Sequence, residues 1–239
     1  NKLNKFSMYI RTLLGAPEIL AVQEAENLNA LQDLADKINA DDATLVYTPY
    51  LQEGNDVGGI DVGFMVRNNV AVNNVTQLGA AEIFTFDNTL LHDRPPLVLD
   101  ATLPDGRAIT VMNLHQRSLI DIDHPTNGPR VRQKRHDQAT SVSLMVQNLQ
   151  TGNPNINLAV TGDFNAFQFT DGYVHVLGQI MGTPADASQA LIPGTDTVNP
   201  DLINKVLSLP AAEQYSFNFG GSAQVLDHIL VSQGLQTAV

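Results

Sequence analysis

The stretch NINLAVTGDFNAF, residues 155–167, has the pattern of a buried strand that ends in a polar turn. The run NLAVT predicts a strand over residues 157–161, and Gly162 follows it at once. Asp163 and Asn165 come next, and both residue types are common in turns. The stretch therefore leaves two interpretations open, a plain strand end or one corner of an active site.

Three other predicted strands carry polar side chains that a purely structural strand would not need. Glu24 follows EILAV, His115 follows VMNL, and Asp227 lies inside QVLDHILV. Each has a structural alternative: a first-turn acid of the next helix, a core histidine, and a partner for an arginine. Taken together, carboxylates and an amide suit a hard divalent cation such as Mg²⁺, and a nearby histidine can transfer a proton. Because catalytic groups tend to lie on strand ends and loops, the set predicts a metal-assisted site.

The hydrophobic pattern alternates between helical and strand periods. The first helix contains Phe6, Ile10, Leu13 and Leu14, and a second spans 28–38 with Asn27 as its N-cap. The predicted strands are EILAVQ, TLVYT, IDVGFMV, NVAVNNVTQL, PLVLDATL, RAITVMNL, NLAVT, YSFNF and QVLDHILV. A hairpin turn is expected over 103–107, a helix over 130–150, and short helical pieces such as 201–208. This order favours a mixed sheet or two packed sheets flanked by helices.

The composition excludes several kinds of site. The 239 residues include no cysteine, which excludes disulfides, cysteine nucleophiles and thiolate metal sites. The net charge of −12 argues against a general basic surface for nucleic acid. No apolar run approaches roughly 18 residues, so no membrane span is expected. Six of the 13 basic residues lie between Arg107 and Arg135, as either a solvated loop and helix face or a local phosphate-binding rim.

Five segments carry a resemblance to a known family. LAVQEAEN, RPPLVL, NLHQRS, VTGDFNAF and YSFNFGGSAQVLDHILVS occur in the order and at about the separations seen in the endonuclease/exonuclease/phosphatase superfamily. The chain resembles its deoxyribonuclease-like branch, and bacterial secreted nuclease-like members most closely, over nearly its whole length. The resemblance implies an α/β (α+β) fold, a four-layer α-β-β-α sandwich of two mixed sheets flanked by helices. It also implies a single domain over residues 1–239.

The resemblance implies a role for three residues that would meet the metal and the phosphate. Glu24 resembles the main metal carboxylate, for Mg²⁺ or alternatively Mn²⁺ or Ca²⁺. Arg94, in DRPPL, resembles the arginine that contacts the substrate phosphate. His115 resembles the histidine near the leaving or non-bridging phosphate oxygens.

The remaining implied roles concern the two strands that carry carboxylates. Asp163 and Asn165 resemble the pair that positions the attacking water and the phosphate, with Asp163 also near a metal. Asp227 resembles the carboxylate that orients a general-base histidine or helps to hold a second metal. Asp61 is a weaker candidate, either the acid that pairs with the histidine or a loop acid. His228 directly follows Asp227, so in a regular strand its side chain points to the opposite face and away from the site.

The implied reaction is hydrolysis of a phosphate ester by in-line attack of water. The preferred hypothesis is a secreted or periplasmic nuclease, a monomer whose partner is a phosphate-ester substrate such as nucleic acid. A phosphatase or phosphodiesterase acting on a small or lipid-linked phosphate is the alternative, and the acidic composition fits it at least as well. A non-catalytic relative that binds a partner is the third hypothesis, although the retained carboxylates and histidine argue against it.

Two elements of the family pattern do not occur in this sequence. Members begin with a strand carrying an Asn and end with a strand bearing Ser-Asp-His, whose histidine is the usual general base. This sequence begins at the helix that contains Phe6, and no Ser-Asp-His occurs in it. We therefore expect a domain truncated at both ends, which as it stands would be a poor catalyst.

Overall fold

The structure is a computed structural model that describes residues 2–236. A three-stranded sheet contains, in spatial order, β1 (Ile19–Ala25), β3 (Asp61–Arg67) and β2 (Tyr47–Leu51). A six-stranded sheet contains, in spatial order, β10 (Ile203–Asn204), β13 (Asp227–Val231), β9 (Leu158–Asp163), β8 (Ala108–His115), β7 (Leu97–Thr102) and β4 (Ala71–Gln77). Two short hairpins pair β5 (Ile83–Phe84) with β6 (Thr89–Leu90), and β11 (Phe217–Phe219) with β12 (Ser222–Gln224).

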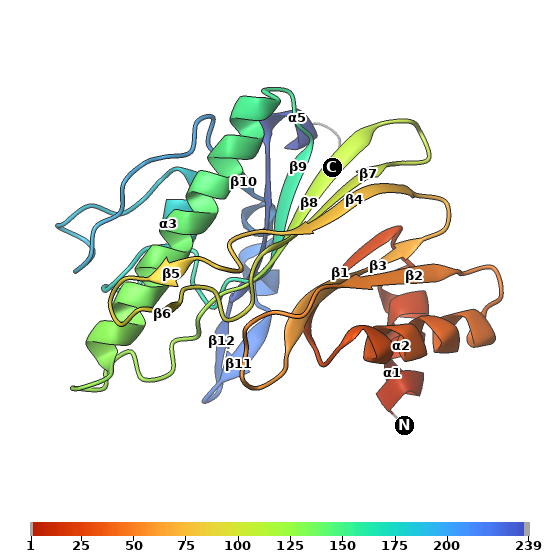
Figure 1. Ribbon diagram of the computed structural model, residues 1–239, viewed down its shortest axis with the longest axis horizontal. Coiled ribbons are helices and arrows are strands. Elements are labelled where there is room, and N and C mark those ends of the chain that lie inside the picture. Colours follow the sequence, from red (N-terminus) through yellow and green to blue (C-terminus); the bar gives the residue numbers. More distant parts are fainter. Residues whose placement is uncertain (1, 237–239) are drawn as a thin grey trace.

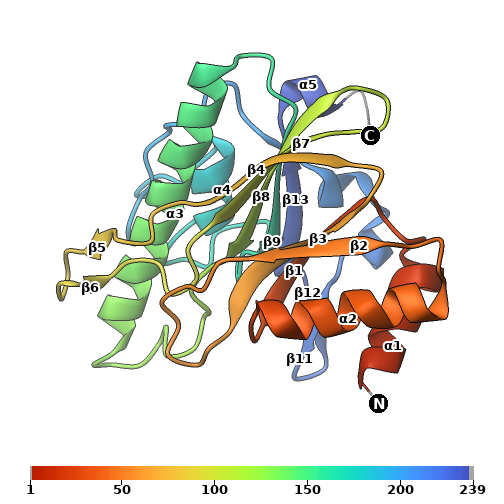
Figure 2. The ribbon, with the colours of Figure 1, turned by 45° about the vertical axis from the view of Figure 1, so that its right-hand side comes forward.

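The helices lie on the outer faces of the two sheets (Figures 1 and 2). The α-helices are α1 (Lys2–Met8), α2 (Leu28–Asp41), α3 (Gly128–Gly152), α4 (Val176–Met181) and α5 (Gln233–Gln236). A π-helical segment, Tyr9–Leu13, continues α1, and two 3₁₀ helices cover Lys205–Ser208 and Ala211–Glu213. Within residues 2–236, none of the helices is both long and apolar enough to cross a membrane.

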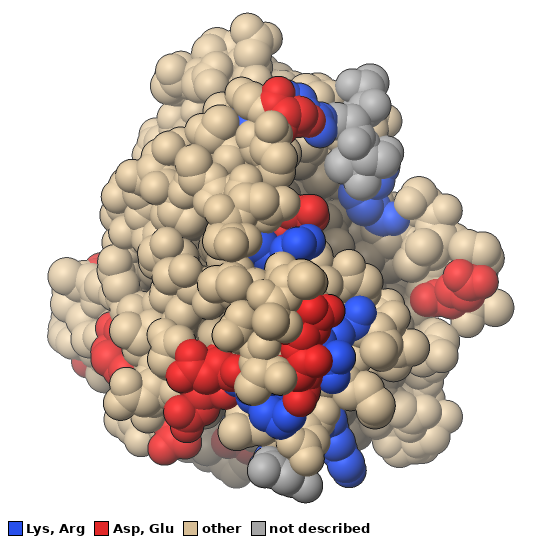
Figure 3. Space-filling view, turned by 90° about the vertical axis from the view of Figure 1, so that its right-hand side faces the viewer, with Lys and Arg blue, Asp and Glu red and all other residues tan. Residues whose placement is uncertain are grey.

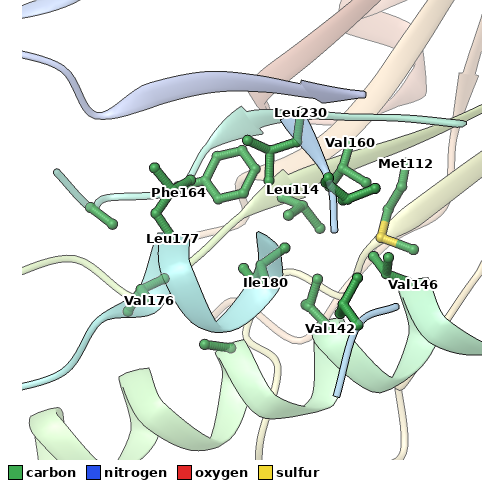
Figure 4. Packing of buried hydrophobic residues seen from close by; sticks show 14 of the residues in the cluster. Met112, Leu114, Val142, Val146, Val160, Phe164, Val176, Leu177, Ile180 and Leu230 are labelled. Carbon is green, nitrogen blue, oxygen red and sulfur yellow. The ribbon is translucent and has the colours of Figure 1, made fainter. Parts of the chain in front are cut away.

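Three hydrophobic cores separate four layers, which confirms the predicted α-β-β-α architecture. One core, including Leu31, lies between α2 and the three-stranded sheet. A second lies between the two sheets and includes Phe64 and Leu97. The third joins the six-stranded sheet to α3 and α4 and includes Phe164, which is fully buried (Figure 4). Burying one such aromatic ring stabilises the fold by about 2–3 kcal/mol.

The strand directions differ in one respect from the expected pair of mixed sheets. Among the described strands, all pairs of the three-stranded sheet are antiparallel. The six-stranded sheet is mixed because β8 and β9 run parallel while their other neighbours run antiparallel. A parallel pair needs a long crossover connection, and α3 supplies it. The prediction of a mixed sheet is therefore correct for the larger sheet and wrong for the smaller one.

The predicted helices are present, with one difference in burial. Asn27 caps α2 as predicted, since its Oδ1 accepts a hydrogen bond from Ala30 N at 2.9 Å. On the first helix only Ile10 of the expected apolar face is buried, whereas Leu13 is exposed. The chain changes from an α-helical to a π-helical turn at Tyr9, which breaks the regular spacing on which the expected face rests.

The C-terminal third is less regular than its sequence suggests. The run QVLDHILV, predicted as one strand over 224–231, divides between β12 and β13. Residues 201–208 are predicted to be helical, but Ile203–Asn204 pair with β13 as β10, and the helical part is a 3₁₀ turn. The buried helix α4 lies in a region whose sequence pattern was too weak to predict it. Tertiary contacts therefore decide the local structure here.

Candidate active site

Three of the predicted side chains lie in a row at one end of the six-stranded sheet. His115 ends β8, Asp163 ends β9 and Asp227 begins β13. The register of β9 places Asp163 opposite His115 in the parallel pair and opposite Asp227 in the antiparallel pair. Neighbouring strands are about 4.8 Å apart, so the three residues share one small area of the sheet edge.

Gly162 allows β9 to lie close to β8 just before this row. Its φ is 133°, in a region that favours glycine. A Cβ at this position would collide with the main-chain oxygen of Leu114. The glycine of the GDFN motif therefore serves the close approach of the two strands that carry His115 and Asp163.

Glu24 approaches the site from the smaller sheet, at a bulge near the end of β1. The register between β1 and β3 shifts between Val22 and Ala25, which leaves Gln23 and Glu24 outside regular pairing. Glu24 is exposed and has a φ of 58°, a left-handed conformation that costs a non-glycine residue about 1–3 kcal/mol. Such strain concentrates at functional sites. The charge of Glu24 raises the pKa of Asp163, so the two sheets bring these carboxylates within electrostatic range.

Asn113 joins the two sheets immediately behind the site. It is fully buried, and its Nδ2 donates hydrogen bonds to Val22 O at 3.0 Å and to Gly63 O at 2.8 Å. Its Oδ1 accepts a hydrogen bond from Gln23 Nε2 at 2.5 Å. The amide therefore connects β8 to both β1 and β3, and it fixes the position of the bulge that carries Glu24.

The surroundings of Asp163 disfavour the negative charge of its carboxylate. Burial raises the pKa of its carboxyl to about 6, and the charges of Asp227 and Glu24 act in the same direction. A hydrogen bond from Asn165 N to Oδ1, 2.7 Å long, opposes this rise. The nearby charges of Asp227 and Glu24 disfavour the ionised form of Asp163, and a bound cation would offset that repulsion.

His115 is neutral at physiological pH. Burial, followed by the charge of Arg94, lowers the pKa of its imidazole to about 4. Its Nε2 lies 3.7 Å from Asp163 Oδ2, a separation too long for a hydrogen bond. Its buried Nδ1 has no hydrogen-bond partner among the described residues. The ring can therefore donate or accept a hydrogen bond at the site, but it carries no charge that would stabilise the Asp163 carboxylate.

The turn after β9 is held by an arginine from α3. Asn165 has a φ of 48°, and its Nδ2 donates to Gln116 O at 3.0 Å. Arg135 is almost fully buried and donates to Asn165 O at 2.9 Å and to Arg117 O at 2.6 Å. Its other terminal nitrogen forms an ion pair with Asp171 at 3.2 Å. Arg135 thus fixes the chain on both sides of the site, a role that the sequence analysis missed.

Arg94 contacts the protein through three of its N–H groups. It donates to His115 O and Gln116 O at 3.3 Å each, and to Asp56 Oδ1 at 3.0 Å. A guanidinium has five N–H donors, so two remain for a phosphate. Asp56, which the sequence analysis did not single out, orients this arginine and also influences the pKa of His115.

The remaining candidates, His228 and Asp61, do not belong to the row. His228 is buried on the opposite face of β13, where its Nε2 lies 2.8 Å from Ala166 O, so the prediction from strand geometry is confirmed. Asp61 begins β3 and accepts a hydrogen bond from Gly54 N at 2.9 Å. The acidic group closest to His115 among the described ion pairs is Asp163.

The basic residues on α3 are mostly engaged by other parts of the protein. Three of its cations form ion pairs with distant carboxylates: Arg130 with Asp87 at 2.6 Å, Lys134 with Asp93 at 2.7 Å, and Arg135 with Asp171. Arg132 covers the ring of Tyr173. On the other side of the molecule, where α1 and α2 lie, basic side chains also lie beside acidic ones (Figure 3). Because most of these cations are already paired, α3 is only partly a solvated face, and the phosphate-binding rim stays a prediction that the pairing disfavours.

Gln116 is a third residue whose place at the site was not predicted from the sequence. It follows His115, is 3% exposed, and both side-chain polar atoms lack a hydrogen-bond partner within residues 2–236. A buried amide without partners is costly unless a ligand or water completes its hydrogen bonds. Its sequence signal was present, since it stands beside the histidine in NLHQRS.

The donors at the site fit an oxygen-coordinated cation held by few protein ligands. Within residues 2–236, no group of three or more His, Asp or Glu side chains is close enough to form a metal cage. Mg²⁺ is commonly held by one or two carboxylates, with waters and substrate oxygens completing its shell. Two carboxylates match that requirement. Glu24 is strained and exposed, and Asp163 has a pKa that burial raises and its acidic neighbours raise further.

Solved structures share this fold at low sequence identity. The catalytic domain of human Nocturnin with bound sulfate has a TM-score of 0.62 and 17% identity, over 97% of this chain and 75% of that one. D. rerio TDP2 complexed with a single-strand DNA product has a TM-score of 0.58 and 18% identity, over 99% of this chain and 78% of that one. A mannosyl-6-phosphatase of Bacteroides thetaiotaomicron has a TM-score of 0.55 and 16% identity, over 97% and 76%.

The sequence comparison is decided by a family model. No curated protein matches the chain. The model described as the endonuclease/exonuclease/phosphatase family matches residues 1–239. The chain therefore belongs to the endonuclease/exonuclease/phosphatase family.

Proposed function

We propose that this protein is a divalent-metal-dependent phosphodiesterase that acts as a nuclease. The observation that supports this most is the row of His115, Asp163 and Asp227 on three adjacent strands. Glu24 faces this row from the other sheet, at a strained bulge. Neutral His115 with the carboxylates of Asp163 and Asp227 beside it suits the transfer of a phosphoryl group to water.

Glu24 would hold the cation, with Asp163 or Asp227 as a second carboxylate. Mg²⁺ is the cation that these ligands suit best, with Mn²⁺ and Ca²⁺ as alternatives. When bound, the cation supplies charge that stabilises negative phosphoryl oxygens.

The protein groups bind and orient the phosphate. Neutral His115 donates a hydrogen bond to a phosphoryl oxygen. With a pKa of about 4, its imidazole is unprotonated near pH 7 and so holds no imidazolium proton to transfer. Arg94, with two N–H groups free, contacts a second oxygen. Asp163, held by Asn165 N, accepts a hydrogen bond from the attacking water and so orients it.

Nucleic acid is the proposed substrate class, and a smaller phosphate ester is the alternative. The D. rerio TDP2 structure with its single-strand DNA product supports the first. The phosphatase from Bacteroides thetaiotaomicron supports the second, as does the pairing of the α3 cations with carboxylates. Those cations are engaged, so a nuclease of this design would make few phosphate contacts and would depend only weakly on salt.

Hydrolysis assays on the full-length protein separate these functions. Plasmid DNA, single-stranded DNA, RNA and p-nitrophenyl phosphate are each incubated with Mg²⁺ and with EDTA. We expect EDTA, Glu24→Gln and Asp163→Asn each to reduce cleavage of nucleic acid at least 100-fold. Activity that survives both substitutions would contradict the metal-dependent hydrolase, and turnover of p-nitrophenyl phosphate alone would favour the phosphatase. No activity in any assay would favour the non-catalytic relative.

A further inference from the structure

Exposed aromatic side chains gather beside the candidate active site. Tyr215, Phe217 and Phe219 are 62%, 46% and 68% exposed. The rings of Phe217 and Phe219 are nearly parallel, at 19°, with centroids 6.4 Å apart. Phe217 and Phe219 alternate along β11, so they lie on one face of the β11–β12 hairpin. Exposed apolar groups that gather in this way mark a binding surface.

This hairpin is continuous with the active-site strand. Ser216 Oγ accepts hydrogen bonds from Leu226 N and Asp227 N, both at 3.1 Å. β12 ends at Gln224 and β13 begins at Asp227, so two residues separate the hairpin from the candidate carboxylate. Figure 2 shows β11 and β12 projecting beyond the end of β13 where that carboxylate lies. A substrate bound with its phosphate at the row of His115, Asp163 and Asp227 would therefore pass close to the aromatic face.

The chemistry of the hairpin identifies what it binds. Residues 214–224 contain no charged side chain, in a protein whose net charge is −12. A duplex is bound mainly through cations on its phosphates, and a membrane surface through basic side chains together with apolar ones, aromatic rings included. Residues 214–224 contain no basic side chain, so neither mode of binding suits the hairpin. Unpaired nucleobases, by contrast, stack on aromatic rings without any need for charge.

We propose that the β11–β12 hairpin is a stacking platform for the unpaired bases of a single-stranded nucleic acid next to the scissile phosphate. The proposal rests on the nuclease function proposed above and narrows its substrate to single strands. Stacking contributes about 1–3 kcal/mol per base, and it does not distinguish strongly between bases. The platform therefore replaces phosphate contacts that the paired cations of α3 do not supply.

A tryptophan probe tests binding without catalysis. The chain contains no tryptophan, so Phe219→Trp introduces a single fluorophore on the platform. Single-stranded oligothymidine, added in EDTA to prevent cleavage, is expected to quench its fluorescence at least twofold in a saturable manner. An abasic oligomer of equal length is expected to leave it unchanged. Equal quenching by the abasic oligomer would overturn the proposal.

A matched probe is available elsewhere on the surface. Phe86 is also exposed, at 54%, and its ring stacks on Phe84 at 5.6 Å, but it lies on the β5–β6 hairpin beside α3. Phe86→Trp should not respond to oligothymidine, and a similar response there would overturn the proposal. Phosphatidylcholine vesicles serve as the second ligand. A blue shift of the Phe219→Trp emission with vesicles but no response to oligothymidine would assign the hairpin to a lipid surface instead.

Kinetics on a double variant complete the test. Phe217→Ser/Phe219→Ser is expected to raise KM for a single-stranded oligonucleotide about tenfold or more, with kcat and the hydrolysis of an abasic oligomer within twofold. Phe86→Ser should change neither parameter. If the double variant cleaves as wild type does, the platform is wrong and the nuclease proposal stands. If wild type cleaves no nucleic acid, the nuclease proposal fails, and the fluorescence titration still decides whether the hairpin binds bases.

Discussion

Asp163 and Asp227 lie directly opposite each other in the antiparallel pair of β9 and β13, so two carboxylates share one end of the sheet. Burial is the main reason that the pKa of Asp163 rises to about 6, and the charge of Asp227 adds to it. The folded-state pKa thus lies above the ordinary value of 3.8. The folded state therefore favours the protonated carboxyl. This contribution to stability is complete below about pH 4 and is lost as the pH rises through 6.

The first prediction concerns the free-energy cost of burying the negative charge of Asp163. Asp163→Asn keeps an oxygen for Asn165 N but removes the buried charge, so it should stabilise the metal-free protein at pH 7. A pKa unit corresponds to about 1.4 kcal/mol, which sets an upper limit of roughly 3 kcal/mol for the gain. Urea unfolding in EDTA measures it, and the gain should shrink as the pH falls to 4. Asp105→Asn, which removes an exposed carboxylate hydrogen-bonded to Arg107, should bring no gain.

The second prediction concerns the cation. Mg²⁺ at 100 times its Kd should stabilise wild type by about 2.7 kcal/mol, because only the folded state assembles the carboxylates. Glu24→Gln should abolish this gain in a thermal unfolding experiment with and without EDTA. Glu26→Gln changes an exposed glutamate two positions away and should keep the gain. A full response to Mg²⁺ in Glu24→Gln would remove Glu24 from the metal site.

The third prediction concerns Asn113. Asn113→Leu keeps the size of the side chain but leaves Val22 O and Gly63 O without their donor. Buried groups that lose a partner cost about 1–3 kcal/mol each, so unfolding in urea should show a loss of roughly 2–4 kcal/mol. Asn73→Ala removes one exposed hydrogen bond, to Thr102, and should change stability by less than about 1 kcal/mol. Equal effects of the two substitutions would refute the bridging role.

The fourth prediction concerns Arg135. Arg135→Met leaves the buried Asp171 unpaired and frees the turn at Asn165. Breaking a buried pair in this way costs about 3–5 kcal/mol, and cleavage should fall as well because the turn positions Asp163. Arg107→Met breaks an exposed pair with Asp105 and should cost less than about 1 kcal/mol. Chemical denaturation and single-turnover cleavage give the two readouts.

The fifth prediction is a pH dependence of stability. Burial lowers the pKa of His228, and its Nδ1 faces the Nδ2 of Asn204, whose Oδ1 already accepts from Val206 N. Neutral His228 therefore stabilises the fold above its ordinary pKa of 6.5, and this contribution is lost as the pH falls below it. Wild type should lose more stability between pH 8 and pH 5 than His228→Phe does. An equal loss, measured by urea unfolding, would show that His228 is not responsible.

Local signals in the sequence predicted much of the fold. The cap at Asn27, the turn over 103–107 and the strand at NLAVT each depend on neighbouring residues, and the structure confirms them. The opposite placement of Asp227 and His228 also follows from strand geometry alone. What failed was the interpretation of segments whose structure depends on distant partners, such as 201–208.

The pairing of charges is the clearest example of such dependence. Arg130 pairs with Asp87, and Lys134 with Asp93, across about forty positions of sequence. Composition shows that these cations exist, but only the packing of the β5–β6 region against α3 decides that they are engaged. The cross-sheet bonds of Asn113 are equally invisible in the sequence, because β8 meets β1 and β3 only when the two sheets pack together.

Asn113 sets the distance between the two sheets of the sandwich. One carboxamide bonded to two main-chain oxygens sets the spacing from β8 to β1 and β3, whatever loops extend beyond the strand ends. Loops at the rim are then free to diverge, or to be exchanged by an engineer, without altering the gap across which Glu24 faces Asp163. Substrate preference would then depend on the loops at the rim. The alignment of Glu24 with Asp163 would depend on the single buried amide of Asn113.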